Sequence, residues 1–283
     1  MPAVPGAYVD LHMHSTASDG SRAPADVVRA AKAAGLAAIA LTDHDSVAGL
    51  REAQDVGCEL GVRVVNGVEL SAVEGALETH LLGLHLRNTH LLVAALHGLR
   101  DMRERRGQEI VEKLIALGVH ITFADVLLQA DGGVVGRPHV ARALVEDGWA
   151  TDSRDAFDRY LGAGRPAFVP KEQLSMPDAI AMIHAAGGLA VLAHPGSAGT
   201  LERLAALRAI GLDGVEVRHP GHSPHDTARL RTLTEQLGLV ASGGSDWHGA
   251  AEGARTIGMM QVPAEWLARQ DARLAALGRA PAA

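Results

Sequence analysis

Short apolar runs alternate with amphipathic segments in the first and last parts of the chain. Each run is nearly continuous, which is typical of parallel strands buried on both faces. Proline at the start of an amphipathic stretch and glycine after its end indicate helices between the runs. The predicted strands are residues 8–14, 37–41, 62–70, 80–86, 190–194, 214–219, 239–242 and 256–262. The predicted helices between them are residues 24–35, 46–56, 177–186, 200–210 and 224–237.

This alternation of strands and helices predicts an α/β fold with a parallel sheet. About seven βα units are enough to close a barrel, and such barrels carry their chemistry at the carboxyl ends of the strands. The rhythm changes near Asn88, after which residues 91–117, 123–129, 137–146 and 153–161 are expected to be helical. We therefore expect residues 89–171 to form a mostly helical insertion, usable as a substrate lid, between residues 1–88 and 172–283 of one barrel.

Composition excludes several classes of protein. The 283 residues include 26 Lys and Arg against 33 Asp and Glu, a net charge of −7, which argues against partners such as long nucleic acid or anionic membranes. No apolar stretch approaches the ~20 residues of a membrane span, and a single cysteine, Cys58, cannot form an internal disulfide. We expect a cytoplasmic protein. The 15 His, against 3 Phe, 2 Tyr and 3 Trp, are the first indication of metal chemistry.

Almost every predicted strand ends in a residue that can ligate a metal. His12 and His14 lie two apart on one strand, so both imidazoles face the same side and can reach one ion. The candidates are His12, His14, Asp19, His44, Glu69, His80, His194, Asp246 and His248. Imidazoles and carboxylates without thiolates suit Mn²⁺, Fe²⁺ or Zn²⁺ in a hydrolytic site. Six imidazoles and three carboxylates exceed the needs of one ion, so we expect two or three divalent ions.

Seven of these nine residues lie in segments that resemble the motifs of the PHP (polymerase and histidinol phosphatase) superfamily. The segments are Asp10-Leu11-His12-Met13-His14-Ser15 with Asp19-Gly20, then Thr42-Asp43-His44, His194-Pro195 and Asp246-Trp247-His248. The resemblance covers residues 8–88 and 172–262 and implies a distorted seven-stranded α/β barrel with a cleft for three metal ions. Within the family, the likeness is to phosphoesterases that carry a helical insertion and hydrolyse 3′,5′-nucleoside bisphosphates or short RNA from the 5′ end.

The resemblance also implies how the ligands group. His12, His14, Glu69 and Asp246 would hold a first ion, Glu69 would bridge to a second ion on His80 and His194, and Asp19, His44 and His248 would hold a third. Mn²⁺ is the expected metal, with Fe²⁺ or Zn²⁺ as alternatives. Asp43 and Asp45 are expected to support the ligands rather than bind metal, because a carboxylate beside a metal-bound histidine commonly orients the ring.

Cationic and imidazole side chains outside this set are candidates for contacts with substrate. Arginine binds phosphate through two parallel hydrogen bonds. The candidates are Arg103, Arg106, Arg137 and His139 in the insertion, Lys171 at its end, and His222 and His225 in a loop that also contains His219. A solvated helix face for Arg103 and Arg106, and an ordinary surface loop for the histidines, remain alternatives.

The ligand set predicts phosphate-ester hydrolysis by a metal-bound hydroxide, without a nucleophilic side chain. The absence of a Gly-x-Ser-x-Gly elbow and of a phosphate-binding P-loop agrees with this. With the resemblance, the predicted reaction is removal of the 3′-phosphate from a 3′,5′-bisphosphate nucleoside. Alternatives are a 5′–3′ exoribonuclease acting on short oligonucleotides, a histidinol phosphatase, and a non-enzymatic metal-binding accessory module. An amidohydrolase barrel is disfavoured because no lysine lies at a matching strand end.

Overall fold

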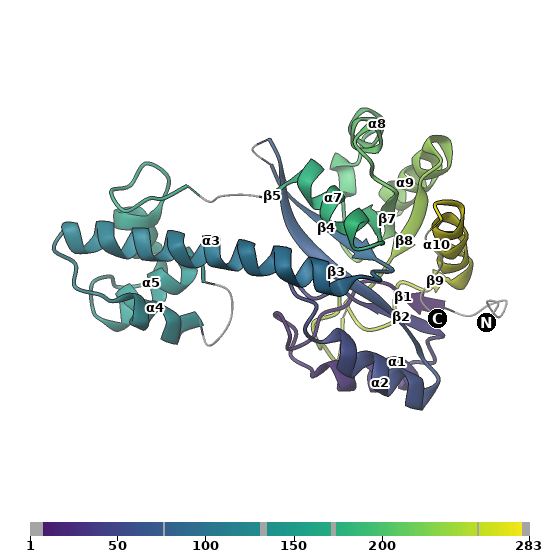
Figure 1. Cartoon of the computed structure of the whole chain (residues 1–283), viewed down its shortest axis with the longest axis horizontal. Helices are drawn as coiled ribbons and strands as arrows, with labels where there is room; N and C mark the ends of the chain where they lie inside the picture. The colour runs from purple at the N-terminus through teal and green to yellow at the C-terminus, as the bar shows by residue number, and fades with distance from the viewer. Residues whose placement is uncertain (1–7, 76, 131–134, 171–173, 254, 279–283) are drawn as a thin grey trace. The chain divides into compact units, whose positions relative to one another are not determined.

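The computed structural model describes residues 8–75, 77–130, 135–170, 174–253 and 255–278. Two compact units divide the chain: unit 1 contains residues 1–93 and 174–283, and unit 2 contains residues 94–173 (Figure 1). These boundaries fall a few residues after those expected for the barrel and the insertion. Among the described residues, no helix combines the length and the apolar character that crossing a bilayer requires.

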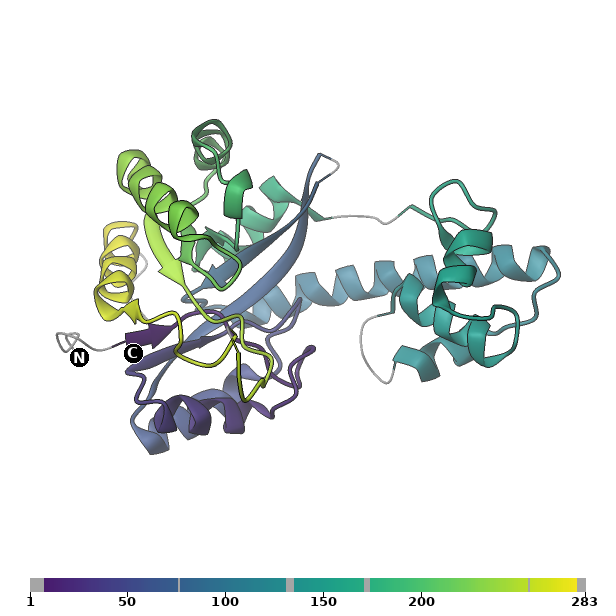
Figure 2. The same ribbon diagram turned by 180° about the vertical axis from the view of Figure 1, so that it is seen from behind.

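Unit 1 is built from strands and helices that alternate along the chain. Its strands are β1 (Tyr8–Asp10), β2 (Ala38–Leu41), β3 (Arg63–Glu74), β4 (Leu77–Leu84), β5 (Leu174–Ser175), β6 (Leu189–Leu192), β7 (Gly214–Arg218), β8 (Val240–Gly243) and β9 (Val262–Pro263). Its helices are α1 (Pro24–Ala33), α2 (Leu50–Leu60), α7 (Met176–Ala185), α8 (Leu201–Ala209), α9 (Pro224–Leu237) and α10 (Ala264–Ala276). The helices lie around the outside of the sheet, α1 and α2 beside β2 and β3, and α9 and α10 beside β8 (Figure 2).

The sheet of unit 1 has the order β8-β7-β6-β4-β3-β2-β1-β9, with β5 paired to β3. Strands β1, β2 and β3 are parallel, and so are β6, β7 and β8. The predicted α/β class with a barrel-like sheet is confirmed. The described residues contain nine strands, against the eight predicted from the sequence pattern and the seven that the family resemblance implies. The unexpected strand is β5, a short strand that pairs with β3.

Strand β4 runs antiparallel to both β3 and β6, so the prediction of parallel strands is wrong at this position. A parallel partner for β3 would need a crossover of roughly a dozen residues or more. Here only a tight connection that includes Gly75, with a φ of +64°, joins Glu74 to Leu77. The reversal places His80, near the start of β4, opposite Ser71 of β3. His80 therefore reaches the same rim as residues that follow the ends of the parallel strands.

The segments after β1 and β8 pair with each other and nearly close the sheet at this rim. The main-chain N–H of His14 donates to the carbonyl oxygen of Trp247 at 2.9 Å. A Cβ atom on Gly244 would lie 2.4 Å from the main-chain nitrogen of His12, so glycine is required where the two segments cross. Of the strand predicted over 8–14, only Tyr8–Asp10 forms a strand, and the residues after it hydrogen-bond with the segment that follows β8.

Two further predicted elements are wrong in part. The helix expected from Ser46 begins only at Leu50, because the hydroxyl of Ser46 accepts a hydrogen bond from Ala48 in a turn. Of the strand expected over 256–262, only Val262 is in a strand, paired with β1 as part of β9. The residues before it form turns around Gly258, whose φ of +75° a strand does not use.

Unit 2 is helical in the described residues 94–130 and 135–170, as expected. Its helices are most of α3 (Thr89–Ala116), then α4 (Phe123–Ala130), α5 (Arg137–Glu146), α6 (Ser153–Ala156) and a π-helical turn at Phe157–Leu161. It has an apolar core of its own, centred on Ile110, Leu114 and Leu144, which are buried almost completely. Removing such side chains from water is the main term that stabilises a unit of this size.

Candidate metal centre

The predicted ligands come from separate strand ends and meet at one rim of unit 1. His12 and His14 follow β1 and are fully buried, and Glu69 lies in β3 with a 1% exposed side chain. The remaining members are Asp19 in the loop after β1, His44 after β2, His80 in β4, His194 after β6, and Asp246 and His248 after β8. Residues separated by up to about 230 positions in sequence are thus neighbours, because the barrel brings these strand ends together.

Glu69 lies at the centre of this arrangement, with each carboxylate oxygen facing a different set of imidazoles. Its Oε2 lies 3.0 Å from Nε2 of His12, 3.1 Å from Nε2 of His14 and 3.4 Å from Nδ1 of His44. Its Oε1 lies 2.9 Å from Nδ1 of His80 and 3.1 Å from Nε2 of His194. A carboxylate that has imidazole nitrogens near both of its oxygens has the arrangement required to bridge two metal ions.

Asp246 completes the most deeply buried group. Its Oδ1 lies 3.2 Å from Nε2 of His14 and 3.5 Å from Nε2 of His12. Together with Glu69, these residues place one ligand atom each within 4.8 Å of all the others. This is the set that the family resemblance implies for a first ion.

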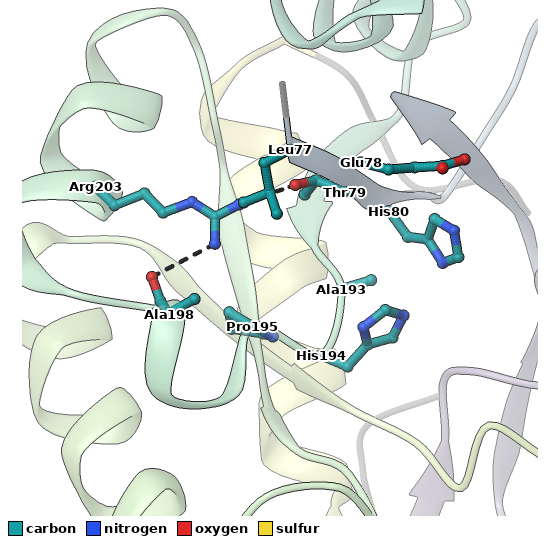
Figure 3. Close-up of a pocket in the computed structure, with 9 residues that line it drawn as sticks. All are labelled: Leu77, Glu78, Thr79, His80, Ala193, His194, Pro195, Ala198 and Arg203. Carbon is teal, nitrogen blue, oxygen red and sulfur yellow. Dashed lines mark hydrogen bonds between the residues drawn. The ribbon is translucent and has the colours of Figure 1, made fainter. Parts of the chain in front are cut away.

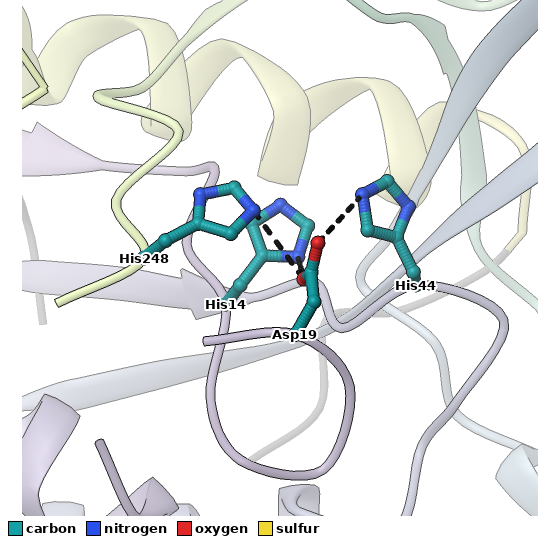
Figure 4. Close-up of side chains that lie close together, drawn as sticks. All are labelled: His14, Asp19, His44 and His248. Carbon is teal, nitrogen blue, oxygen red and sulfur yellow. Dashed lines mark ion pairs between the residues drawn. The ribbon is translucent and has the colours of Figure 1, made fainter. Parts of the chain in front are cut away.

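A second group surrounds Asp19, whose carboxylate points between three imidazoles (Figure 4). Asp19 lies 3.3 Å from Nε2 of His248, 3.6 Å from Nδ1 of His14 and 3.9 Å from Nε2 of His44. The structure therefore adds His14 to the three residues expected for the third ion. His14 uses its two nitrogens toward two different groups.

The third group differs more from the expectation. The atoms within 4.8 Å of one another belong to His44, Glu69 and His80 rather than to Glu69, His80 and His194. The ring of His44 lies between those of His14 and His80, with centroid separations of 4.6 and 5.0 Å. His194 reaches the same oxygen of Glu69 as His80, and the centroids of the two rings lie 5.2 Å apart.

His12 and His194 form hydrogen bonds with Glu69, but two other imidazole nitrogens at this rim have no hydrogen-bond partner. Nδ1 of His80 lies 2.9 Å from a Glu69 oxygen, yet it is buried without a hydrogen bond of acceptable alignment. Nδ1 of His14 is also buried without a hydrogen-bond partner. Buried polar atoms usually form hydrogen bonds. Nitrogen atoms that are buried without them, and that lie beside carboxylate oxygens, can instead bind a cation. The residues fit divalent ions with nitrogen and oxygen ligands.

Burial at this rim raises the pKa values of the carboxylates, but the neighbouring histidines lower them by more. The positive charge of His12 and hydrogen bonds to histidines hold the pKa of Glu69 well below its ordinary value. The pKa of Asp246 is lowered in the same way by His14 and His219. Despite burial, the hydrogen bond from His248 lowers the pKa of Asp19 to about 2. All three carboxylates are therefore ionised near neutral pH, the form that binds a cation.

Several imidazoles are correspondingly biased toward the protonated form. Burial disfavours a charge on His12, but the carboxylates of Glu69 and Glu216 raise its pKa well above the ordinary value. The pKa of His80 is raised against burial by Glu69. A hydrogen bond to Asp19 raises the pKa of His248. Burial lowers the pKa of His44. A divalent ion at this rim would compete with protons for the same nitrogens.

Supporting residues fix the ligands from behind. Nδ1 of His248 donates to the main-chain oxygen of Asp246 at 2.9 Å, which leaves Nε2 facing Asp19. Asp43 accepts hydrogen bonds from the main chain and hydroxyl of Ser15 at 2.7 and 2.8 Å, and from Ser18. Asp43 thus holds the loop that carries Asp19 and does not orient an imidazole ring.

Sequence reasoning missed Glu216 and Arg255, which contact the candidate ligands, and did not place His219 beside them. Glu216, fully buried in β7, lies 3.1 Å from Nδ1 of His12. Nε2 of His219 lies 3.3 Å from Oδ2 of Asp246, and Arg255 donates to the same oxygen. A carboxylate in the middle of the apolar run 214–219 was the available signal for Glu216.

The loop histidines differ in the contacts that they make. Nδ1 of His222 donates to the main-chain oxygen of Val217 and its Nε2 accepts from Gly196, so neither nitrogen remains for a substrate. His225 is exposed in α9. Of the loop histidines, His219 is the one that contacts a candidate ligand.

In unit 2, three arginines form a cluster. Arg106 donates from Nε and a terminal nitrogen to the carbonyl of Val169, at 3.0 and 2.9 Å. Arg137 lies over the ring of Phe168, which precedes Val169, at 5.5 Å from the ring centroid. Burial and the charges of Arg137 and Arg103 lower the pKa of Arg106. Arg103 and Arg106 are both half-buried, which argues against a fully solvated helix face.

Two more of the predicted substrate contacts, Arg137 and His139, lie on α5. Arg137 donates to the carbonyl of Leu161 at 3.2 Å and stacks over aromatic rings of unit 2. His139 accepts a hydrogen bond from the main chain of Gly136 at 2.9 Å through Nδ1, so it closes the start of the helix. Lys171 lies outside the described residues.

The fold and the rim together define an α/β-barrel protein with a candidate centre for several divalent ions. The profile of the PHP domain family matches residues 10–165. A 5′-3′ exoribonuclease of Haemophilus influenzae is 39% identical over 245 residues, which cover 84% of this chain and 89% of the relative. A 3′,5′-nucleoside bisphosphate phosphatase of Chromobacterium violaceum is 37% identical over 259 residues, 89% and 91% of the two chains.

A solved structure agrees with these relatives. The crystal structure of a proposed metal-dependent phosphoesterase from Bifidobacterium adolescentis superposes with a TM-score of 0.72 at 32% identity, covering 96% of this chain and 98% of the other. The chain belongs to the PHP domain family. The resemblance expected from the four motifs is confirmed.

Proposed function

We propose that this protein removes the 3′-phosphate from 3′,5′-bisphosphate nucleosides, converting a compound such as pAp to AMP and phosphate. At the coarser level, it is an enzyme of the metal-dependent phosphoesterase class, in line with its relatives. The observation that carries the proposal is the convergence of five imidazoles on the two oxygens of Glu69. The bisphosphate substrate is suggested by the Chromobacterium violaceum relative.

The rim supplies what hydrolysis of a phosphate ester needs. Divalent ions bound there, with Mn²⁺ as our proposed metal, would neutralise phosphate oxygens, lower the pKa of water and stabilise the leaving alkoxide. His12, His14 and Asp246 are our proposed ligands at the buried end, and Glu69 is the proposed bridge. The remaining proposed ligands are Asp19, His44, His80, His194 and His248. We infer in-line attack by water, with no side chain bonded to phosphorus.

Two cavities open beside His194 and favour a small substrate. One of about 210 Å³ is lined by His80, His194, Pro195 and Arg203 among others (Figure 3). The other, about 150 Å³, is lined by His194, His219 and Asp246 among others. Both are smaller than the ~300–1,000 Å³ pockets of drug-sized ligands. This size suits a phosphate and part of a sugar better than a folded RNA.

The second phosphate of the substrate would need cationic donors outside the metal ligands. We propose the arginine cluster of unit 2, Arg103, Arg106 and Arg137, for this role. Guanidinium groups partly shielded from water bind phosphate more strongly than fully solvated ones. Unit 2 would then contribute substrate binding as a lid, while unit 1 contributes hydrolysis. Lys171 remains a proposed member of this set.

A 5′–3′ exoribonuclease acting on short RNA is the second candidate. The observation in its favour is the 39% identity to the Haemophilus influenzae exoribonuclease. The same metal ligands and the same arginine cluster would serve both reactions, since each breaks a phosphate ester beside a second phosphate. The two candidates differ in the products they release.

The deciding experiment offers Mn²⁺-loaded protein three substrates in parallel: 3′,5′-bisphosphate adenosine, histidinol phosphate and 5′-phosphorylated RNA trimers. We expect inorganic phosphate and AMP from the first at the highest kcat/KM. Mononucleotides released from the trimers at a higher kcat/KM would favour the exoribonuclease. A protein that binds Mn²⁺ but acts on none of the three would refute the proposed function and support an accessory metal-binding role.

A further inference from the structure

A buried carboxylate behind the metal ligands connects two of the proposed ion sites. Glu216 is fully buried in β7, and its two oxygens have different partners. Oε1 lies 3.1 Å from Nδ1 of His12, and Oε2 accepts the main-chain N–H of His194 at 2.7 Å. We propose that Glu216 is a positioning residue that sets the metal-binding form of His12 and the backbone of His194 together. The inference rests on the metal centre proposed above.

One oxygen of Glu216 faces Nδ1 of His12 and determines which ring nitrogen carries the proton. A neutral imidazole carries one N–H, and the nitrogen without it offers the lone pair that a metal needs. The ionised Glu216 can only accept, so it keeps the N–H of His12 on Nδ1. The lone pair on Nε2 then faces the proposed first site, where Glu69 lies 3.0 Å away and Asp246 3.5 Å away. Partners of this kind commonly fix a ligand's tautomer and ring orientation.

The other oxygen of Glu216 holds the backbone at His194. This residue has a φ of +28°, a region that non-glycine residues rarely occupy. Such a conformation persists only where surrounding contacts hold it. The short bond from its N–H to Glu216 is one of those contacts, and the imidazole of His194 reaches Oε1 of Glu69 at 3.1 Å. Glu216 therefore supports a ligand at the other side of the proposed bridge.

Both tasks require an acceptor, which makes the glutamate specific. Glutamine has one acceptor oxygen and one NH₂ donor. If its oxygen served His194, its NH₂ would face Nδ1 of His12 and move the ring proton to Nε2, where the metal should bind. If its oxygen served His12, two donors would meet at the backbone of His194. Glu216→Gln thus damages one ligand in either orientation while it preserves the size of the side chain.

The chain contains a matched control for burial and bonding. Asp213 is also buried, and its Oδ2 accepts the main-chain N–H of Ala190 at 3.0 Å and lies 2.7 Å from Nε2 of His184. It joins a histidine to a strand as Glu216 does, but His184 is not among the proposed ligands. Asp213→Asn should therefore disturb folding in a similar way without touching the metal centre.

The experiment measures Mn²⁺ bound per chain and the apparent dissociation constant in metal-stripped wild-type protein, Glu216→Gln and Asp213→Asn, with thermal unfolding of each. We expect Glu216→Gln to weaken Mn²⁺ binding about 10–100-fold, the range seen for such partners. Asp213→Asn should retain wild-type affinity within about threefold, although its melting temperature falls. High Mn²⁺ should restore turnover in Glu216→Gln but not change that in Asp213→Asn.

Equal Mn²⁺ affinity in wild-type protein and Glu216→Gln would overturn the proposal, and so would equal losses in the two variants. If Glu216→Gln does not fold, Glu216→Asp decides by the same titration, since it keeps both acceptors but shortens their reach. Weaker Mn²⁺ binding in folded Glu216→Asp supports the proposal, and unchanged binding refutes it. A wild-type chain that binds no Mn²⁺ would instead refute the metal centre itself.

Discussion

The rim of unit 1 and the arginine cluster of unit 2 handle charge in opposite ways. At the rim, short side chains in strands and in the segments that follow them direct nitrogen and carboxylate oxygen atoms at shared points, with His14 and Glu69 almost without exposure. In unit 2, long side chains use part of their hydrogen-bonding capacity on carbonyl oxygens, as Arg106 does with Val169 and Arg137 with Leu161. We propose that the first region receives cations and that the second receives an anion.

This difference teaches how the work of the proposed enzyme is divided. A phosphate ester is repelled by nucleophiles because its oxygens are negative, and metal ions remove that obstacle only for the phosphate they contact. A second phosphate needs separate donors, and arginine provides them without competing for the metals. Changes at the rim should therefore abolish turnover, whereas changes in the arginine cluster should act mainly on substrate binding.

The largest expected effect comes from removing a ligand shared by two groups. His14→Ala should lower kcat at saturating substrate by at least ~10³-fold, because metal catalysis contributes several kcal/mol to the barrier. Mn²⁺ bound per chain should fall in the same samples. His184→Ala is the control, since it removes a histidine bonded to Asp213 away from the rim. If His14→Ala turned over substrate about as fast as His184→Ala, the proposed role of the rim in hydrolysis would be contradicted.

A smaller effect is expected in unit 2. Arg137→Ala should raise KM for the bisphosphate about 10–100-fold, the loss expected for a charged hydrogen bond. kcat and bound Mn²⁺ should stay near the wild-type values. Arg154→Ala is the control, because that arginine is 91% exposed on α6. A drop in kcat with unchanged KM would show that the arginine cluster does not act through substrate binding.

The pH dependence of metal binding sharpens the contrast further. The pKa values of His12, His80 and His248 are raised above the ordinary histidine value of about 6.5. Without metal, these imidazoles therefore keep their protons to a higher pH than a free histidine does. Their contribution to stability is present below about pH 6.5 and is lost as pH rises through the raised values. Mn²⁺ must displace these protons, so its affinity should rise about tenfold per pH unit for each proton released. Titrations at pH 6, 7 and 8 test this, and an affinity independent of pH would contradict it.

The smallest effect is expected where unit 1 carries a charged contact unrelated to the rim. Ser223 caps α9 and forms a reciprocal pair with Asp226, whose pKa falls to about 2 through that contact and Arg229. Ser223→Ala should lower the free energy of unfolding by ~1 kcal/mol. Denaturant unfolding measures this, and kcat/KM should not change. A large loss of turnover in this variant would mean that activity follows stability rather than the rim.

The sequence was sufficient to predict that the candidate ligands meet at one rim, but not all of their neighbours. His12 and His14 could be placed because a strand fixes which side chains share a face, and a barrel fixes where strand ends meet. The reversal of β4 was missed because a buried antiparallel strand has the same apolar pattern as a parallel one. His80 nevertheless lies at the rim, since its position near the start of a reversed strand compensates.

The supporting contacts could not be predicted, for a different physical reason. Glu216 and His219 contact the ligands through register between β7 and its neighbours, and the pattern along one strand does not specify that register. The hydrogen bonds of His222 to main-chain atoms depend on the path of a loop. Arginine side chains have several rotatable bonds, so the spacing of Arg103 and Arg106 on a helix indicated a shared face but not their partners.

The central claim is that ions held at the rim of unit 1 hydrolyse the 3′-phosphate of a nucleoside bisphosphate. The most direct test measures bound Mn²⁺ and phosphate release from 3′,5′-bisphosphate adenosine in the same samples of wild-type protein and Asp246→Asn. The account predicts that wild-type protein binds two or three Mn²⁺ and releases one phosphate and one AMP per substrate, and that Asp246→Asn loses both metal and turnover. Phosphate release at the wild-type rate by Asp246→Asn, or none from Mn²⁺-loaded wild-type protein, would contradict it.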